Sequence, residues 1–138
     1  MAAMSCCSLP KDAKGVSAWV LRSAFGLALV FIGVKHLMTV DSFAGFVAQD
    51  LGVLSPLGEL WAYIYSILLV VGGVLFVLDI HRDKAAWAAG VALGSVVVGM
   101  LLKPLLGGVE LGSVMPAVHN TWIWLLVYGY VVCCNNSK

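Results

Sequence analysis

Four apolar stretches, each close to the length of a membrane-spanning helix, constrain the fold of this chain more than any other feature. They cover residues 16–38, 57–78, 85–102 and 116–134. A helix needs about 20 residues to cross about 30 Å of hydrocarbon. Lipid offers no partner to backbone groups, so only helices or closed barrels span it, and barrel strands would alternate polar and apolar residues. The sequence therefore predicts an all-α integral membrane four-helix bundle.

The composition agrees with a chain that is embedded in lipid. Hydrophobic residues make up 62% and charged residues 11% of the 138 residues, against about 45–50% and 25% in soluble domains. The net charge of +1 comes without a basic stripe, so we expect the bilayer and no nucleic acid as partner. The length predicts one domain. We expect a transmembrane unit over residues 16–134, preceded by a flexible cytoplasmic tail over residues 1–15 and followed by a short cytoplasmic tail over residues 135–138.

The placement of lysine and arginine predicts the orientation, because these residues gather on the cytoplasmic side of membrane proteins. Of the 8 lysines and arginines, only Lys35 and Lys103 fall at the far end of the predicted helices. The others lie near the termini or near the loop at residues 79–84. We therefore expect a multi-pass membrane protein with both termini on the cytoplasmic side, or on the equivalent side of an organelle.

The first apolar stretch carries charged residues that need an explanation. Arg22 and Lys35 lie about 20 Å apart along a helix, so they either snorkel toward the interfaces or face protein. One helical face gathers the small and polar residues of this stretch, which are Arg22, Gly26, Gly33 and His36. Such a face marks helix–helix contact in membranes. We expect His36 to face the bundle and Lys35 to point away from it.

The connections between the spans also follow from the sequence. Residues 41–50 predict a short helix lying in the outer interface, with its phenylalanines toward the membrane. Ser55-Pro56 predicts the start of the second span. Lys103-Pro104 predicts the end of the third, and Pro116 the start of the fourth, which leaves an apolar loop over 105–115 that re-enters or follows the membrane surface.

The predicted topology places polar residues at similar depth near the outer face. The candidate binding residues are His36, Glu59, Tyr63, His119 and Asn120. Ionisable groups at membrane depth are candidates for function, although such side chains also reach for lipid headgroups. Histidine, tyrosine and asparagine could donate hydrogen bonds to a quinone. Haem between His36 and His119 is a weaker hypothesis because no other haem signature is present. Transport is weakened by the apolar middle of the last two spans.

The four cysteines occur as the adjacent pairs Cys6-Cys7 and Cys133-Cys134. Metal sites favour a C-x-x-C spacing, and a reducing compartment disfavours disulfides. We expect inert thiols, with acylation and metal binding as the alternatives. The sequence predicts no metal site and no catalytic residue.

Several short motifs occur in the order found in a known family. They are Arg22 followed by Gly33-Val34-Lys35, then Phe43-Ala-Gly-Phe46, then Gly72-Gly73 with Leu75-Phe76-Val77-Leu78, and finally His81-Arg82 with Ala85-Ala86. On these motifs residues 20–132 resemble the DoxX/DoxD-like family of small four-helix membrane proteins. Two departures stand out. Gly33 and Lys35 are one residue closer together than is usual in the family, and Ile67-Leu68-Leu69 stands where relatives tend to carry an acidic residue. A role for that acid does not carry over.

The resemblance implies a redox-linked membrane subunit. Relatives include the membrane subunit of thiosulfate:quinone oxidoreductase and membrane partners of redox-protective enzymes. We therefore expect a subunit that anchors partners in a larger membrane complex, contacts quinone at the outer polar cluster, and is not catalytic on its own. The alternatives are a purely structural accessory subunit and a small transporter.

Overall fold

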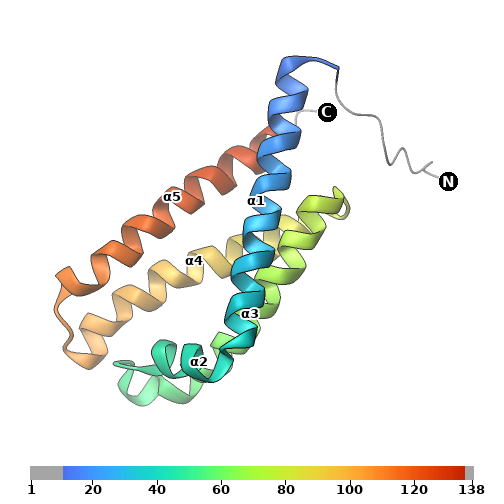
Figure 1. The fold of residues 1–138 in the computed structure, drawn as a ribbon. Helices are drawn as coiled ribbons and strands as arrows, with labels where there is room; N and C mark the ends of the chain where they lie inside the picture. Colours follow the sequence, from blue (N-terminus) through green and yellow to red (C-terminus); the bar gives the residue numbers. More distant parts are fainter. Residues whose placement is uncertain (1–10, 136–138) are drawn as a thin grey trace.

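The computed structural model describes residues 11–135, which form helices joined by short connections. Four of the helices in this range are long and apolar enough to cross a membrane. They are α1 (Ala13–Met38), α3 (Ser55–Leu78), α4 (Arg82–Gly107) and α5 (Leu111–Asn135). The prediction of an all-α membrane helical bundle is confirmed. Both ends of the described chain lie at one end of the bundle, and the short helix α2 (Val40–Ala48) lies at the other (Figure 1).

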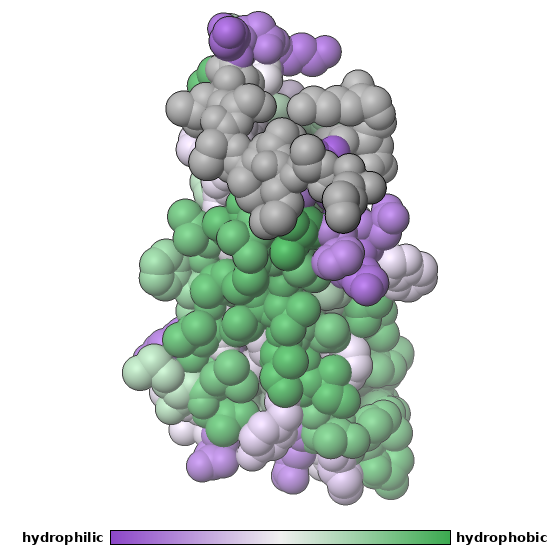
Figure 2. Space-filling model, turned by 90° about the vertical axis from the view of Figure 1, so that its right-hand side faces the viewer, coloured by the Kyte–Doolittle hydropathy of each residue, from purple (hydrophilic) through white to green (hydrophobic). Residues whose placement is uncertain are grey.

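The surface carries the pattern that a bilayer requires. Figure 2 shows apolar side chains gathered in a belt along the length of the helices, with hydrophilic residues toward both ends. Apolar residues as large as Phe31 and Leu126 are more than 70% exposed on this outer surface. Burial in lipid accounts for such exposure, since soluble domains rarely present large contiguous apolar patches. The side of the membrane on which the termini lie stays a prediction from the charge pattern.

The start of the bundle differs slightly from the sequence prediction. The helix α1 begins at Ala13, because the side chain of Asp12 accepts a hydrogen bond from the Gly15 amide (3.1 Å) and caps the first turn. Residues 13–15 are therefore helical and not part of a tail. Residues 1–10 of the predicted N-terminal tail and residues 136–138 lie outside the described range. Asn135 is the last residue of α5.

The connection between α1 and α3 contains the predicted short helix. This helix, α2, begins at Val40, and a single turn, η1 (Gly52–Leu54), leads into α3. The helix α3 starts at Ser55 with Pro56 in its first turn, as predicted. Proline suits that position because the first amides of a helix have no intrahelical partner.

The connection between α4 and α5 corrects the prediction. The helix α4 continues through Pro104 to Gly107, and α5 already begins at Leu111 with Pro116 inside it. The expected apolar loop over 105–115 is therefore reduced to residues 108–110. In a lipid environment each residue outside a helix leaves backbone groups unpaired, so helices continue through proline where a loop would form in water. Gly108, with φ of 68°, ends α4 in the left-handed conformation that glycine tolerates.

Glycines bring α1 and α3 into close contact. A Cβ added at Gly26 would lie 2.7 Å from the carbonyl oxygen of Gly73, and one added at Gly33 would lie 2.9 Å from that of Ser66. Backbones approach this closely where neither residue presents a side chain. Arg22 is buried on the same face, whereas Lys35 is exposed. The predicted packing face of the first span is confirmed.

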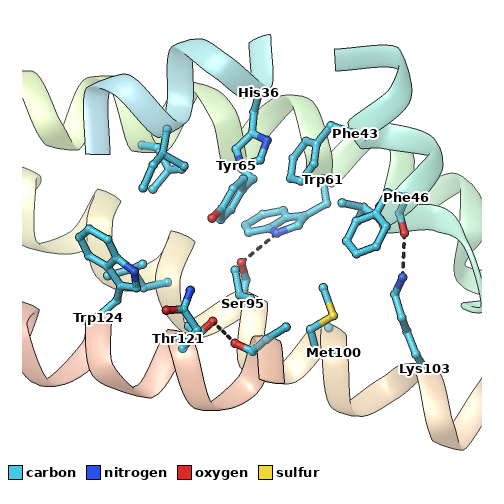
Figure 3. A pocket seen from close by; sticks show the side chains of 18 of the residues that line it. His36, Phe43, Phe46, Trp61, Tyr65, Ser95, Met100, Lys103, Thr121 and Trp124 are labelled. Atoms are coloured by element: carbon cyan, nitrogen blue, oxygen red, sulfur yellow. Dashed lines mark hydrogen bonds between the residues drawn. The ribbon is translucent and has the colours of Figure 1, made fainter. Parts of the chain in front are cut away.

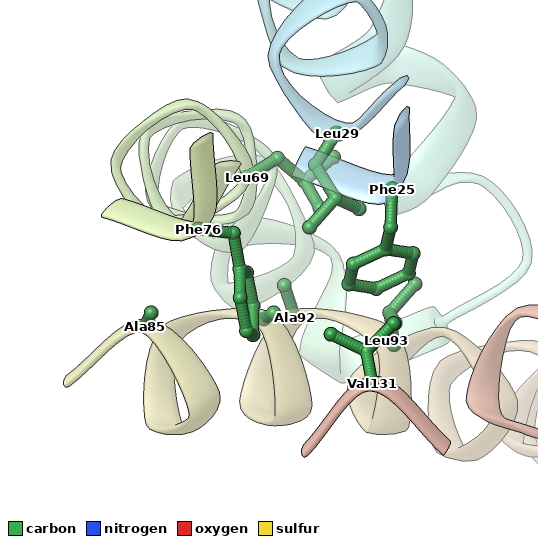
Figure 4. Close-up of a cluster of buried hydrophobic side chains, with 9 residues drawn as sticks. Phe25, Leu29, Leu69, Phe76, Ala85, Ala92, Leu93 and Val131 are labelled. Atoms are coloured by element: carbon green, nitrogen blue, oxygen red, sulfur yellow. The ribbon is translucent and has the colours of Figure 1, made fainter. Parts of the chain in front are cut away.

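The buried core lies where α1 and α3 meet the α4–α5 hairpin (Figure 4). Phe25 and Phe76 meet edge to face with ring centroids 5.5 Å apart. The helix α4 approaches α3 through small side chains, which are Ala85, Ala89 and Ala92, all 0% exposed. Gly72 of α3 packs against this alanine face.

The helices α4 and α5 are joined by a tyrosine that crosses a small-residue face. The hydroxyl of Tyr128 donates a hydrogen bond to the Ala86 carbonyl (2.9 Å), and its ring lies against Gly90. Ala86, Gly90 and Gly94 recur at four-residue spacing along this face, a pattern typical of helix contact in membranes, although Gly94 itself faces open space. A residue with a side chain at position 90 would displace the tyrosine.

Tyr128→Phe is expected to lower the free energy of unfolding by about 1 kcal/mol, because it removes one hydrogen bond and little else. The measurement is an SDS titration in mixed micelles, with helix content followed by circular dichroism. A loss of the same size for Tyr130→Phe, whose side chain is exposed on the same helix, would contradict this assignment.

An ion cluster closes the end of the bundle that holds the termini. The carboxylate of Asp79 forms an ion pair with Nη1 of Arg22 at 2.8 Å and a second ion pair with Nε of Arg82, also at 2.8 Å. Asp79 ends α3 in the left-handed conformation (φ 55°), which aspartate tolerates better than most residues. The buried guanidinium of α1 is thereby tied to the turn between α3 and α4.

Candidate functional site

A cavity of about 290 Å³ lies within the bundle, toward the end that carries α2. All four long helices and α2 contribute to its walls. In Figure 1, α5 lies near α1 toward the chain termini and diverges from it toward α2. The volume is at the lower end of the range for small-molecule sites, about 300–1,000 Å³. It suits one ring system with its substituents.

Aromatic side chains from three helices form one wall of the cavity. The imidazole of His36 stacks on the ring of Phe43 with centroids 3.9 Å apart. Tyr65 lies beside both, with its centroid 5.9 Å from His36 and 5.6 Å from Phe43. The short helix α2 therefore contacts the end of α1 and α3 through Phe43, and the three tilted rings form an aromatic wall of the cavity (Figure 3).

Three polar side chains in the cavity wall already form hydrogen bonds within the protein. The indole Nε1 of Trp61 donates to the Ser95 hydroxyl (3.0 Å), which donates in turn to the Ala92 carbonyl (2.7 Å). The hydroxyl of Thr121 donates to the Ala117 carbonyl (2.8 Å). These bonds fix the walls and leave little capacity for a ligand.

Tyr65 differs from these groups because its hydroxyl has no partner among the described residues. The ring is half-buried and lines the cavity, and Figure 3 shows its oxygen directed into the open space. His36 and Asn120 also line the cavity without a hydrogen bond to any described side chain or backbone group. The cavity thus combines apolar and aromatic walls with a few polar groups that are available to a ligand.

Lys103 lies at one end of the cavity and is only 5% exposed. Its ammonium donates to the Phe46 carbonyl (2.7 Å) and lies 4.4 Å from the centroid of the Phe46 ring. The Phe46 carbonyl belongs to the last turn of α2, where carbonyls lack intrahelical partners. A buried cation therefore faces the same space as the Tyr65 hydroxyl.

The structure divides the five residues that the sequence placed in one cluster. His36 and Asn120 line the cavity, whereas Glu59, Tyr63 and His119 are exposed outside it. The Tyr63 hydroxyl donates to Asp41 instead (3.3 Å). Residues at nearly the same membrane depth can point to different sides of a helix. Tyr63 and Tyr65 are two residues apart and therefore point about 200° apart around α3.

Sequence reasoning missed several residues of the cavity. The polar ones are Trp61, Tyr65, Ser95, Lys103 and Thr121. A usable signal was present for two of them, because Trp61 and Tyr65 are four residues apart and share one face of α3.

The haem and metal hypotheses gain no geometric support in the described range. His119 is exposed and outside the cavity that His36 lines, so the structure does not bring the two histidines together. Residues 11–134 contain no group of three or more His, Cys, Asp or Glu side chains able to hold a metal ion. Cys133 is exposed and Cys134 half-buried, and neither forms a disulfide bond within the described range, while Cys6 and Cys7 lie outside the described residues.

Comparison with known proteins gives partial relatives. Among the curated proteins that this chain matches are the multidrug resistance proteins MdtG of Dickeya zeae (strain Ech586), at 31% identity over 97 residues, and of Enterobacter lignolyticus (strain SCF1), at 35% over 98 residues. The alignments cover 70% and 71% of this chain and 21% of each relative. The chain thus spans about a fifth of the length of the curated relatives it matches. No family model and no solved structure matches it.

Proposed function

We propose that this chain is a DoxX-like subunit of a redox-linked membrane complex, and that it binds the ring of a quinone in the cavity beside α2. One observation carries the proposal: the Tyr65 hydroxyl has no partner among the described residues and is directed into an apolar, aromatic-lined space of about 290 Å³. Such a space favours a flat lipophilic ring, and a hydroxyl donor favours a carbonyl on that ring.

The chemistry of a quinone fits the groups that line the cavity. Its ring is planar and stacks on aromatic faces such as the pair His36 and Phe43. Its carbonyl oxygens accept hydrogen bonds, and the Tyr65 hydroxyl is a donor at membrane depth. The chain would hold the ring and anchor a partner, and the partner would carry out the electron transfer. The resemblance of residues 20–132 to the DoxX/DoxD-like family supports this division of labour.

A small transporter is the second candidate, and the comparisons favour it. The matched relatives are named as multidrug resistance proteins, and a cavity with aromatic walls also suits lipophilic compounds. Uptake of a lipophilic dye into liposomes that contain only this chain would support transport. Retention of quinone without any uptake would support the subunit.

Tyr65→Phe is expected to weaken quinone binding about tenfold, because a net hydrogen bond contributes about 0.5–1.5 kcal/mol and 1.4 kcal/mol is a factor of ten. The measurement is quenching of tryptophan fluorescence by a short-chain ubiquinone in detergent micelles, since Trp61 and Trp124 line the cavity. Tyr63→Phe is the matched control, two residues away and outside the cavity, and should leave the dissociation constant unchanged. Equal effects of both variants would contradict the proposed site.

A further inference from the structure

We infer that the cavity binds an amphiphile with an acidic oxygen, and that the ammonium of Lys103 receives this oxygen. The inference rests on the proposed function only in using the same cavity as a ligand site. The inference specifies the charge of the ligand, which the aromatic walls and the Tyr65 hydroxyl do not determine. The acidic oxygen could belong to a ring hydroxyl or to a fatty-acid carboxylate, and the two sources share the same contact.

The first step is the charge balance around Lys103. The side chain is 5% exposed, and no carboxylate of the described residues lies within 4.0 Å of its ammonium. Asp50, on the loop after α2, is half-buried but forms no ion pair with it. Buried charges in proteins are normally paired, and ionisable groups inside membranes usually pair with one another or mark a ligand path. The carboxylate of Asp50 attracts the Lys103 ammonium from beyond ion-pair distance. The ammonium therefore has no counter-ion in direct contact among the described residues.

The second step is the donor count. An ammonium has three N–H donors, and one goes to the Phe46 carbonyl (2.7 Å). Lys103 also lines the cavity (Figure 3). No described residue accepts a hydrogen bond from either of the two remaining donors. A charge-assisted bond to an anionic oxygen is shorter and stronger than a neutral one.

The third step concerns the shape of the ligand. Phe46 and Met100 lie next to Lys103 in the cavity wall and give this end an apolar surface (Figure 3). A small hydrated anion such as phosphate would lose its water there without gaining enough contacts. An acidic group joined to a ring or chain brings apolar surface with it, so the class that fits is an anionic amphiphile.

Two naphthoquinones of nearly equal shape test the inference. Lawsone carries a ring hydroxyl that is ionised at neutral pH, and its methyl ether is uncharged. The wild-type protein in detergent micelles is expected to bind lawsone about tenfold more tightly than the ether. Lys103→Met should abolish this preference and Lys103→Arg should retain it. Lys35→Met is the matched control, an exposed lysine at the same end of the bundle, and should leave the preference unchanged. Lys103→Gln replaces Lys103→Met if that variant does not fold.

The outcomes separate the inference from the proposed function. Equal binding of lawsone and its ether to the wild type would overturn the inference while leaving the quinone site intact, with Lys103 serving only to hold α2. Binding of decanoate that depends on Lys103, without binding of either naphthoquinone, would support the inference and overturn the quinone proposal. Preference for lawsone that survives Lys103→Met would also overturn the inference.

Discussion

Asp79→Asn is expected to lower the free energy of unfolding by about 3 kcal/mol. Asp79 pairs with the buried Arg22 of α1 and with Arg82 of α4. Removing one partner of a buried ion pair leaves an uncompensated charge, which destabilises by about 3–5 kcal/mol. We expect a loss at the lower end of this range because the Asp79 side chain is still 32% exposed, so solvent screens part of the charge. Asparagine tolerates the left-handed conformation at this position, so the substitution tests the charge and not the turn. An SDS titration in mixed micelles measures the loss.

A matched variant and a double variant make this test specific. Asp83→Asn removes an exposed carboxylate four residues away and should cost less than about 1 kcal/mol, the usual size of a helix-dipole effect. Arg22→Met combined with Asp79→Asn removes the buried cation together with its counter-charge. The double variant should be more stable than Asp79→Asn alone. Losses that simply add would show that Arg22 and Asp79 do not stabilise each other.

The case of Arg22 shows what helical periodicity reveals and what it leaves out. The positions of Arg22, Gly26 and Gly33 predicted the buried face of α1, and that face is the one observed. The partner of Arg22 could not be predicted in the same way. Asp79 lies in the short turn after α3, which it ends in the left-handed conformation, and its carboxylate pairs with Arg22 of α1. Periodicity is a property of one helix, whereas pairing depends on how two helices cross.

The sequence predicted how deep the polar residues lie along the helices, but not in which direction their side chains point around the helix axis. The polar cluster was expected near the α2 end of the bundle, and His36 and Asn120 do line the cavity there. The predicted cluster included Tyr63 and not Tyr65, and the two side chains point to opposite sides of α3. Lys103 was read as a helix end because Pro104 follows it. In lipid the helix continues past Pro104, and the Lys103 side chain is buried inside the bundle.

Gly73→Ala is expected to lower the free energy of unfolding by about 2 kcal/mol. A Cβ at this position would lie 2.5 Å from the Gly26 carbonyl oxygen and 2.8 Å from a methyl carbon of Val30. Real Cβ atoms essentially never come this close to other atoms, so α1 and α3 must separate. Overpacking of this kind costs about 1–3 kcal/mol, and it exceeds the gain from the higher helix propensity of alanine, which is at most about 1 kcal/mol.

Gly94→Ala is the control for the same chemical change, because a Cβ at Gly94 meets nothing within 4 Å. This variant should be neutral or slightly more stable, and equal losses at the two positions would rule out helix contact as the cause. Separation of α1 and α3 in the Gly73→Ala variant should also change the ligand site. Leu29 and Leu69 belong to the core between α1 and α3 and also line the cavity. A protein in which Gly73→Ala separates these helices should therefore bind quinone more weakly, although the glycine lies outside the cavity wall, while Gly94→Ala should keep the wild-type affinity.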